Sequence, residues 1–163
     1  MRNVLFLCTG NSARSIIAET LLNEIGKGVF QAYSAGSDPT GKVNPHAVVI
    51  LKLLGYSSVS QARSKSWDEF SGDEAPELDL VVTLCDQAAG EVCPVWPGAP
   101  LQIHWGFPDP AAKKDDQIAR EAFMDVYDMI NDFISALIRV RLEDHTTQSF
   151  TQAIREQMET RHD

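Results

Sequence analysis

The chain has 163 residues, of which 44% are apolar, and a formal net charge of −9 at pH 7. This length fits one domain with a sizeable core, and the negative charge argues against nucleic acid and anionic membranes as partners. No apolar run is long enough to cross a bilayer. Residues 1–3 lead directly into an apolar stretch and leave no room for a signal peptide, so we expect a cytoplasmic protein.

The chain contains three cysteines, Cys8, Cys85 and Cys93, which are too few for a disulfide scaffold. In a reducing compartment a disulfide is more often catalytic than structural. The Cys and His residues do not have the spacing of a zinc site, so we predict no metal site.

The first forty residues contain the strongest functional pattern. Val4–Leu7 is apolar and predicts a buried strand, whereas Ile16–Leu22 has the apolar spacing of a helix. Between them, Cys8–Ser15 is a loop of small and polar residues. A loop of this kind at a helix start can converge its backbone N–H groups on one anion, and the helix end adds partial positive charge.

Cys8 and Arg14 suit chemistry on an oxyanion. The guanidinium of Arg14 is a planar fork of donors that fits a tetrahedral oxyanion, and its charge, with that of the helix end, favours the reactive thiolate of Cys8. Ser15 could donate a hydrogen bond to the Cys8 sulfur. The alternative is a buried structural cysteine, but this leaves the arginine six residues later unexplained.

Strands and helices alternate along the rest of the chain. The pattern predicts further strands at Val29–Ser34, Leu78–Leu84 and Leu101–Trp105, and helices at Ala47–Leu54, Asp86–Gly90 and Asp115–Arg139. It predicts that Ile118 and Met124 lie on or near the apolar face of the last of these. The proline-rich segment 93–100 predicts a mobile loop with Trp96 exposed or only partly packed. Such alternation indicates an α/β fold, a flavodoxin-like parallel sheet with helices on both faces.

The loop resembles a known family. Cys-x5-Arg-Ser directly after the first strand is similar to the phosphate loop of low-molecular-weight protein tyrosine phosphatases and of the arsenate reductases built on that fold. This resemblance implies a four-stranded sheet in the order 2-1-3-4 and a catalytic domain over residues 1–140. It also implies substrate binding by the loop residues Thr9, Gly10, Asn11, Ser12, Ala13 and Ser15. The remainder, 141–163, reads as an extension, either helical, with Phe150, Ile154 and Met158 at four-residue spacing, or frayed.

Later segments resemble the arsenate reductase branch. They are Val82–Cys85, Cys93–Pro94, His104–Phe107 and Asp109–Ala111. The resemblance implies that Cys8 attacks arsenate, that Asp109 protonates the departing oxygen, and that Cys85 and then Cys93 carry a disulfide relay. It implies thioredoxin as the reductant, with glutathione and glutaredoxin as the other option. A phosphatase acting on phosphoesters through Cys8 is the alternative function, with phosphate or sulfate as mimics of arsenate in either case.

Some relatives hold a potassium ion beside this loop, through residues equivalent to Asn11, Glu19 and Ser34 and an acidic residue. In this chain the acidic position falls near Lys65, with Arg63 close by. A built-in cation could replace the metal ion, so this departure from the family pattern predicts no potassium requirement. We also expect no cofactor.

Overall fold

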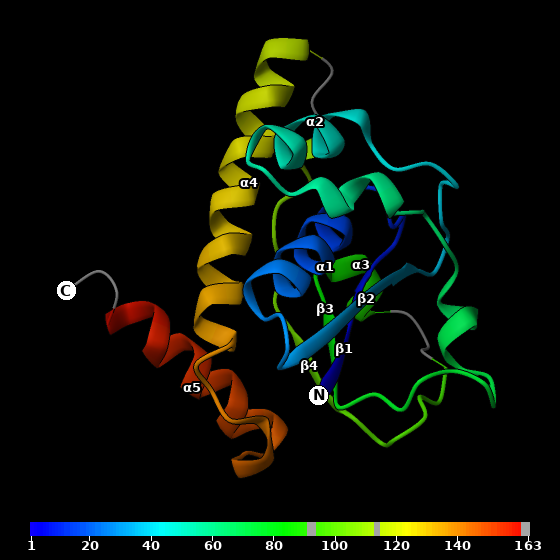
Figure 1. Ribbon diagram of the computed structural model, residues 1–163, viewed down its shortest axis with the longest axis vertical. Helices are drawn as coiled ribbons and strands as arrows, with labels where there is room; N and C mark the ends of the chain where they lie inside the picture. The colour runs from blue at the N-terminus through cyan, green and yellow to red at the C-terminus, as the bar shows by residue number, and fades with distance from the viewer. Residues whose placement is uncertain (91–93, 113–114, 161–163) are drawn as a thin grey trace.

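A computed structural model describes residues 1–90, 94–112 and 115–160 of the protein. Four strands form one sheet: β1 (Arg2–Cys8), β2 (Phe30–Gly36), β3 (Leu80–Thr83) and β4 (Leu101–His104). They lie in the order β2-β1-β3-β4 and all neighbours are parallel (Figure 1). The predicted fold class and strand order are confirmed.

Five α-helices connect or follow the strands: α1 (Arg14–Ile25), α2 (Pro45–Leu53), α3 (Asp86–Ala89), α4 (Asp116–Leu137) and α5 (Thr147–Thr160). Four short 3₁₀ helices are also described: η1 (Ser57–Gln61), η2 (Trp67–Phe70), η3 (Pro110–Ala112) and η4 (Leu142–Asp144). The helix starts follow local chemistry. Asn44 caps α2, with Pro45 in its first turn, and the side chain of Asp115 accepts from two backbone N–H groups of α4.

The central strand β1 is buried on both faces, which explains its unbroken apolar run. Val4 and Phe6 face the larger core, where α1, α2, α4 and α5 pack. Leu5 and Leu7 face a smaller core. Because β1 lies between β2 and β3, the loop that follows it is held over the middle of the sheet.

Trp96 belongs to this smaller core, and the prediction that it is exposed or only partly packed is wrong. Trp96 is 4% exposed, and it packs with residues of β1 and with Phe70 and Leu78. The ring of Trp67 meets it edge-on, with centroids 6.2 Å apart. The reason is that η2 and the segment before β4, rather than a long helix, cover this face, so a large apolar side chain must fill it.

The apolar stripe of α4 also differs from the prediction at its N-terminal end. Ile118 and Met124 are 51% and 39% exposed, whereas Phe123, Ile130 and Phe133 are fully buried. Figure 1 shows that this end of α4 extends past the sheet, beside α2, where the sheet offers no surface to cover these side chains. Among the described residues, no helix is both long and apolar enough to cross a membrane.

The described part of the segment after residue 140 contains helix α5, and a helix was one of the two predicted alternatives. Phe150 and Ile154 are 1% and 0% exposed, and both belong to the larger core. α5 packs against α4 and β4.

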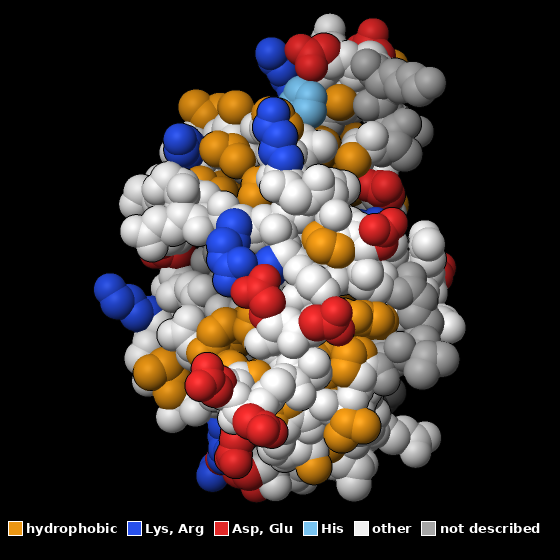
Figure 2. All heavy atoms as spheres, turned by 90° about the vertical axis from the view of Figure 1, so that its right-hand side faces the viewer, with side chains coloured by type: hydrophobic (Ala, Val, Ile, Leu, Met, Phe, Trp, Pro, Cys, Tyr) orange, Lys and Arg blue, Asp and Glu red, His pale blue; other side chains and the backbone are white. Residues whose placement is uncertain are grey.

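Figure 2 shows another face of the molecule, on which acidic side chains are spread singly or in small groups among apolar ones.

Candidate active site

The loop between β1 and α1 encircles a pocket. Cys8 is the last residue of β1 and Arg14 the first of α1. Neighbouring segments hold the loop carbonyls from outside: Asp38 N–H donates to Thr9 O at 3.0 Å and Thr40 N–H donates to Gly10 O at 3.0 Å. Because C=O and the next N–H point in opposite directions across a trans peptide, these contacts turn the following amides towards the pocket.

Two backbone features make this loop possible. Asn11 has φ 45°, a left-handed conformation that asparagine tolerates better than most residues. Gly36, at the end of β2, lies against the loop, and a Cβ there would stand 2.4 Å from Thr9 O. A glycine is therefore required for this close approach of two backbones.

A chain of hydrogen bonds behind the loop ends on the Cys8 sulfur. Lys65 N–H donates to Asn11 Oδ1 at 2.9 Å, which fixes Asn11 Nδ2 as the donor to Ser15 Oγ at 2.8 Å. Ser15 Oγ lies 2.9 Å from Cys8 Sγ. Since the hydroxyl oxygen accepts from Asn11, its own hydrogen is free to donate to the Cys8 sulfur. Asn11 and Ser15 are fully buried and support the loop from behind.

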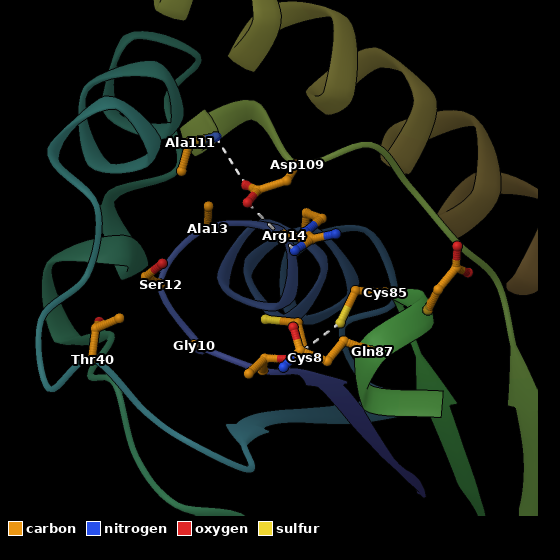
Figure 3. A pocket seen from close by; sticks show the side chains of 12 residues that line it. Cys8, Gly10, Ser12, Ala13, Arg14, Thr40, Cys85, Gln87, Asp109 and Ala111 are labelled. Atoms are coloured by element: carbon orange, nitrogen blue, oxygen red, sulfur yellow. Dashed lines mark hydrogen bonds and ion pairs between the residues drawn. The ribbon is translucent and has the colours of Figure 1, made fainter. Parts of the chain in front are cut away.

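Arg14 lies over the pocket, where its position is fixed by a backbone contact. Its Nη1 donates to Phe107 O at 3.0 Å, and its Nη2 is 4.0 Å from Asp109 Oδ2 (Figure 3). The Asp109 side chain is 48% exposed, and its Oδ1 accepts from Ala111 N–H at 2.9 Å. A guanidinium and a carboxyl group thus share the mouth of the pocket, in positions suited to bind an oxyanion and to give a proton to an oxygen that leaves it.

Cys85 lies two residues after the end of the neighbouring strand β3, at the start of α3, and lines the pocket beside Cys8. It is 5% exposed and packs with Cys8 and Ala88 in one small cluster. Its Sγ accepts from Ala88 N–H at 3.4 Å and lies 3.6 Å from Thr9 Oγ1. Both cysteines are free thiols. Cys93 lies outside the described residues.

The pocket has a volume of about 490 Å³. Its lining joins loop residues to residues from three other segments: Cys8, Thr9, Gly10, Ser12, Ala13, Arg14, Thr40, Cys85, Asp86, Gln87, Asp109 and Ala111. Sequence reasoning did not place Thr40, Ala111, Asp86 or Gln87 there. For the last two a signal existed, because they follow Cys85 at the carboxyl end of β3, where ligands of such sheets bind.

Behind the loop, Lys65 occupies the position expected for a built-in cation. Its Nζ donates to Ser34 Oγ at 3.3 Å and to Arg63 O at 3.0 Å, and Ser34 Oγ donates to Glu19 Oε2 at 2.6 Å. Burial raises the pKa of Glu19, which the charge of Lys65 and the Ser34 hydrogen bond oppose. Burial likewise lowers the pKa of Lys65, against the attraction of Glu19.

This geometry predicts the response to potassium. Because the ammonium of Lys65 already meets oxygen ligands, exchanging potassium for sodium should leave the melting temperature of the protein unchanged. Lys65→Gln removes the cation and should make the melting temperature rise in potassium relative to sodium. Thermal unfolding in the two salts, with Lys27→Gln as an exposed control, tests this. A marked effect of potassium on the unsubstituted protein would contradict it.

Comparisons with known proteins agree with this geometry. A model of the family "Low molecular weight phosphotyrosine protein phosphatase" matches residues 3–153. The chain is 41% identical over 128 residues to an arsenate reductase of Halalkalibacterium halodurans, and the match covers 78% of this chain and 88% of the relative. It is 38% identical over 120 residues to an arsenate reductase of Bacillus subtilis, covering 74% and 82%.

Solved structures of the same kind are similar in fold. One is a thioredoxin-dependent arsenate reductase of Corynebacterium glutamicum, with a TM-score of 0.58 and 26% identity over 85% of this chain and 62% of that one. An arsenate reductase in a phosphate-binding state gives a TM-score of 0.60 and 25% identity over 83% and 98%. The matched loop, the strand order and these relatives together show that the chain belongs to the low-molecular-weight phosphotyrosine protein phosphatase family.

Proposed function

We propose that this protein reduces arsenate to arsenite, with Cys8 as the nucleophile and Cys85 and Cys93 as a disulfide relay. The observation that carries the proposal is the packing of two free thiols, Cys8 and Cys85, against each other at one oxyanion pocket. Phosphoester hydrolysis needs only the first of them. The relatives named as arsenate reductases support the same function.

The chemistry balances through the residues of the pocket. The Cys8 thiolate attacks arsenic while the amides of the loop and Arg14 hold the oxyanion, and Asp109 protonates the oxygen that leaves as water. The Cys85 thiolate then attacks Cys8 Sγ. A sulfur–sulfur bond forms, the sulfur–arsenic bond breaks, and its electron pair stays on arsenic, which leaves as arsenite.

Regeneration follows by thiol–disulfide exchange. Cys93 attacks Cys85, which frees Cys8 and leaves a Cys85–Cys93 disulfide for an external dithiol. We assign thioredoxin as that dithiol, with glutathione and glutaredoxin as the alternative. Free thiols at the site fit a reducing compartment, so we place the protein in the cytoplasm, with neither nucleic acid nor membrane as a partner.

Phosphoester hydrolysis through a Cys8 phosphocysteine is the second candidate, and the family membership favours it as a residual activity. The loop recognises phosphate and arsenate equally, since the two share shape and charge. The rest of the pocket wall, however, is small and polar, with Thr40, Gln87 and Ala111. Such a wall suits a small inorganic oxyanion better than an aromatic phosphoester.

The relay is tested by arsenate-dependent NADPH consumption coupled to thioredoxin and thioredoxin reductase. Cys85→Ser and Cys93→Ser should each lower multiple turnover by at least about 100-fold. The Cys93→Ser cycle stops after one arsenite per protein, and the Cys85→Ser cycle stops before that. Replacing the thioredoxin couple with glutathione and glutaredoxin identifies the reductant. If both variants consume NADPH at the unsubstituted rate, the protein has no relay, and p-nitrophenyl phosphate hydrolysis becomes the activity to pursue.

A further inference from the structure

We infer that His104 is a positioning residue for Cys85, acting through Asp86, an inference that rests on the proposed relay. His104 is the last residue of β4 and pairs in register with Thr83, the last residue of β3. Its Nδ1 lies 2.8 Å from Thr83 Oγ1, and its Nε2 lies 2.9 Å from Asp86 Oδ1. One imidazole therefore joins the ends of two strands to the first residue of α3.

The proton positions of this bridge follow from its partners. The Asp86 carboxylate only accepts, so Nε2 of His104 carries the hydrogen of the 2.9 Å bond. The other ring nitrogen, Nδ1, shares a hydrogen bond with the Thr83 hydroxyl. Gly106 leaves the space that the bridge needs, since a Cβ there would stand 3.3 Å from both Asp86 Oδ1 and His104 Nε2.

The bridge adds a side-chain tether to a helix of a single turn, in which Ala88 is the buried residue. α3 spans only four residues, and one turn of helix is marginal in water because a costly nucleus gains few hydrogen bonds. The Asp86 side chain is 97% exposed, so packing contributes almost nothing to its position. Cys85, the residue before it, caps the same turn through the bond from Ala88 N–H to its Sγ.

Fixing this turn determines where the second sulfur points. Cys85 Sγ must face Cys8 when the arsenic adduct forms, and both residues line the pocket, side by side in Figure 3. A near-attack position of the two sulfurs speeds the exchange. His104 does not line that pocket, so its effect is on the approach of Cys85 and not on binding of the oxyanion.

The first test isolates the exchange in a Cys93→Ser background, where the relay stops at the Cys8–Cys85 disulfide. After one equivalent of arsenate, samples are quenched with an alkylating agent and the disulfide is followed by mass. His104→Ala should slow its formation about fivefold, the scale of an exposed charged pair, and His104→Gln, which can still donate to Asp86, should recover part of the rate. The affinity for inorganic phosphate, which does not use Cys85, should stay the same.

A second variant and a second chemistry keep the inference separable from the proposed function. Asp86→Ala changes an exposed side chain and should cause the same slowing, without a further loss when His104→Ala is added. Hydrogen peroxide converts Cys8 to a sulfenic acid, and Cys85 then displaces water to form the disulfide. With dimedone present, the His104→Ala and Asp86→Ala variants should each show more dimedone-labelled Cys8 than the Cys93→Ser parent. This result does not depend on whether the protein reduces arsenate.

Two results would overturn the positioning role of His104, and a third would refute the reductase function. An unchanged disulfide rate and an unchanged dimedone yield in His104→Ala would overturn the positioning role. So would a His104→Ala effect that is equally large in the Asp86→Ala background. Failure of the unsubstituted protein to reduce arsenate, with the peroxide partition still sensitive to His104, would refute the reductase function alone.

Discussion

Replacing Cys8 with serine should abolish arsenate reduction, by a factor of about 10⁴ or more, and leave phosphate binding in place. In the proposed mechanism the loop amides and Arg14 hold the oxyanion, and the substitution touches neither of them. The hydrogen-bond chain from Asn11 through Ser15 matches a thiolate. A serine hydroxyl in the same place stays protonated near neutral pH and attacks far more slowly. Arsenate-dependent turnover and phosphate titration of the same sample measure both effects.

The matched control is Cys85→Ser, which removes the neighbouring thiol of the same buried cluster. It should retain the first chemical step and accumulate an arsenic adduct on Cys8, whereas Cys8→Ser should form none. Mass measurement of the intact protein after mixing with arsenate distinguishes the two. An adduct on Cys8→Ser, or turnover within tenfold of the unsubstituted protein, would refute the assignment of Cys8 as the nucleophile.

A large stability effect is expected at Phe150, in the last helix. We expect Phe150→Ala to lower the free energy of unfolding by about 3–5 kcal/mol, the range for truncation of a buried aromatic side chain. Phe150 is 1% exposed and belongs to the larger core. Helix α5, which lies in the segment predicted as an extension to a catalytic domain, would then be an integral part of the fold and not an appendage.

Gln152→Ala provides the control on the same helix, because that side chain is exposed. It should change the unfolding free energy by less than about 0.5 kcal/mol. Urea unfolding of the three proteins gives both values. If Phe150→Ala unfolds at the urea concentration of the unsubstituted protein, α5 contributes nothing to the stability of the fold.

The individual strands and the phosphate loop were readable from the sequence because each is formed by one continuous stretch, whereas the strand order came from the family resemblance. A buried strand, a small-residue loop and a helix start occupy one continuous stretch, and Cys8, Arg14 and Ser15 lie within eight residues of one another. The Cys8–Ser15 contact was predicted from this spacing and the structure contains it. Likewise, Pro45 at the start of α2 follows from the chemistry of that residue alone.

What the sequence did not reveal depends on contacts between distant segments. Trp96 was expected on the surface because its own neighbours are prolines, but its burial is decided by η2 and β1. Thr40 reaches the pocket only because its backbone is bonded to Gly10, thirty positions earlier. The bridge from His104 to Asp86 likewise depends on the register between β3 and β4, which periodicity does not supply.

The contact between Gly36 and the phosphate loop has a consequence for how variants of this protein are interpreted. Gly36 does not line the pocket, yet its missing side chain lets the end of β2 lie against Thr9 O, Cys8 O and Asn11. In a saturation library selected for arsenic tolerance, substitutions of Gly36 should be tolerated as poorly as substitutions of the proposed nucleophile. That result would report the geometry of the loop's support, and it would be misread if intolerance to substitution were equated with a role in chemistry.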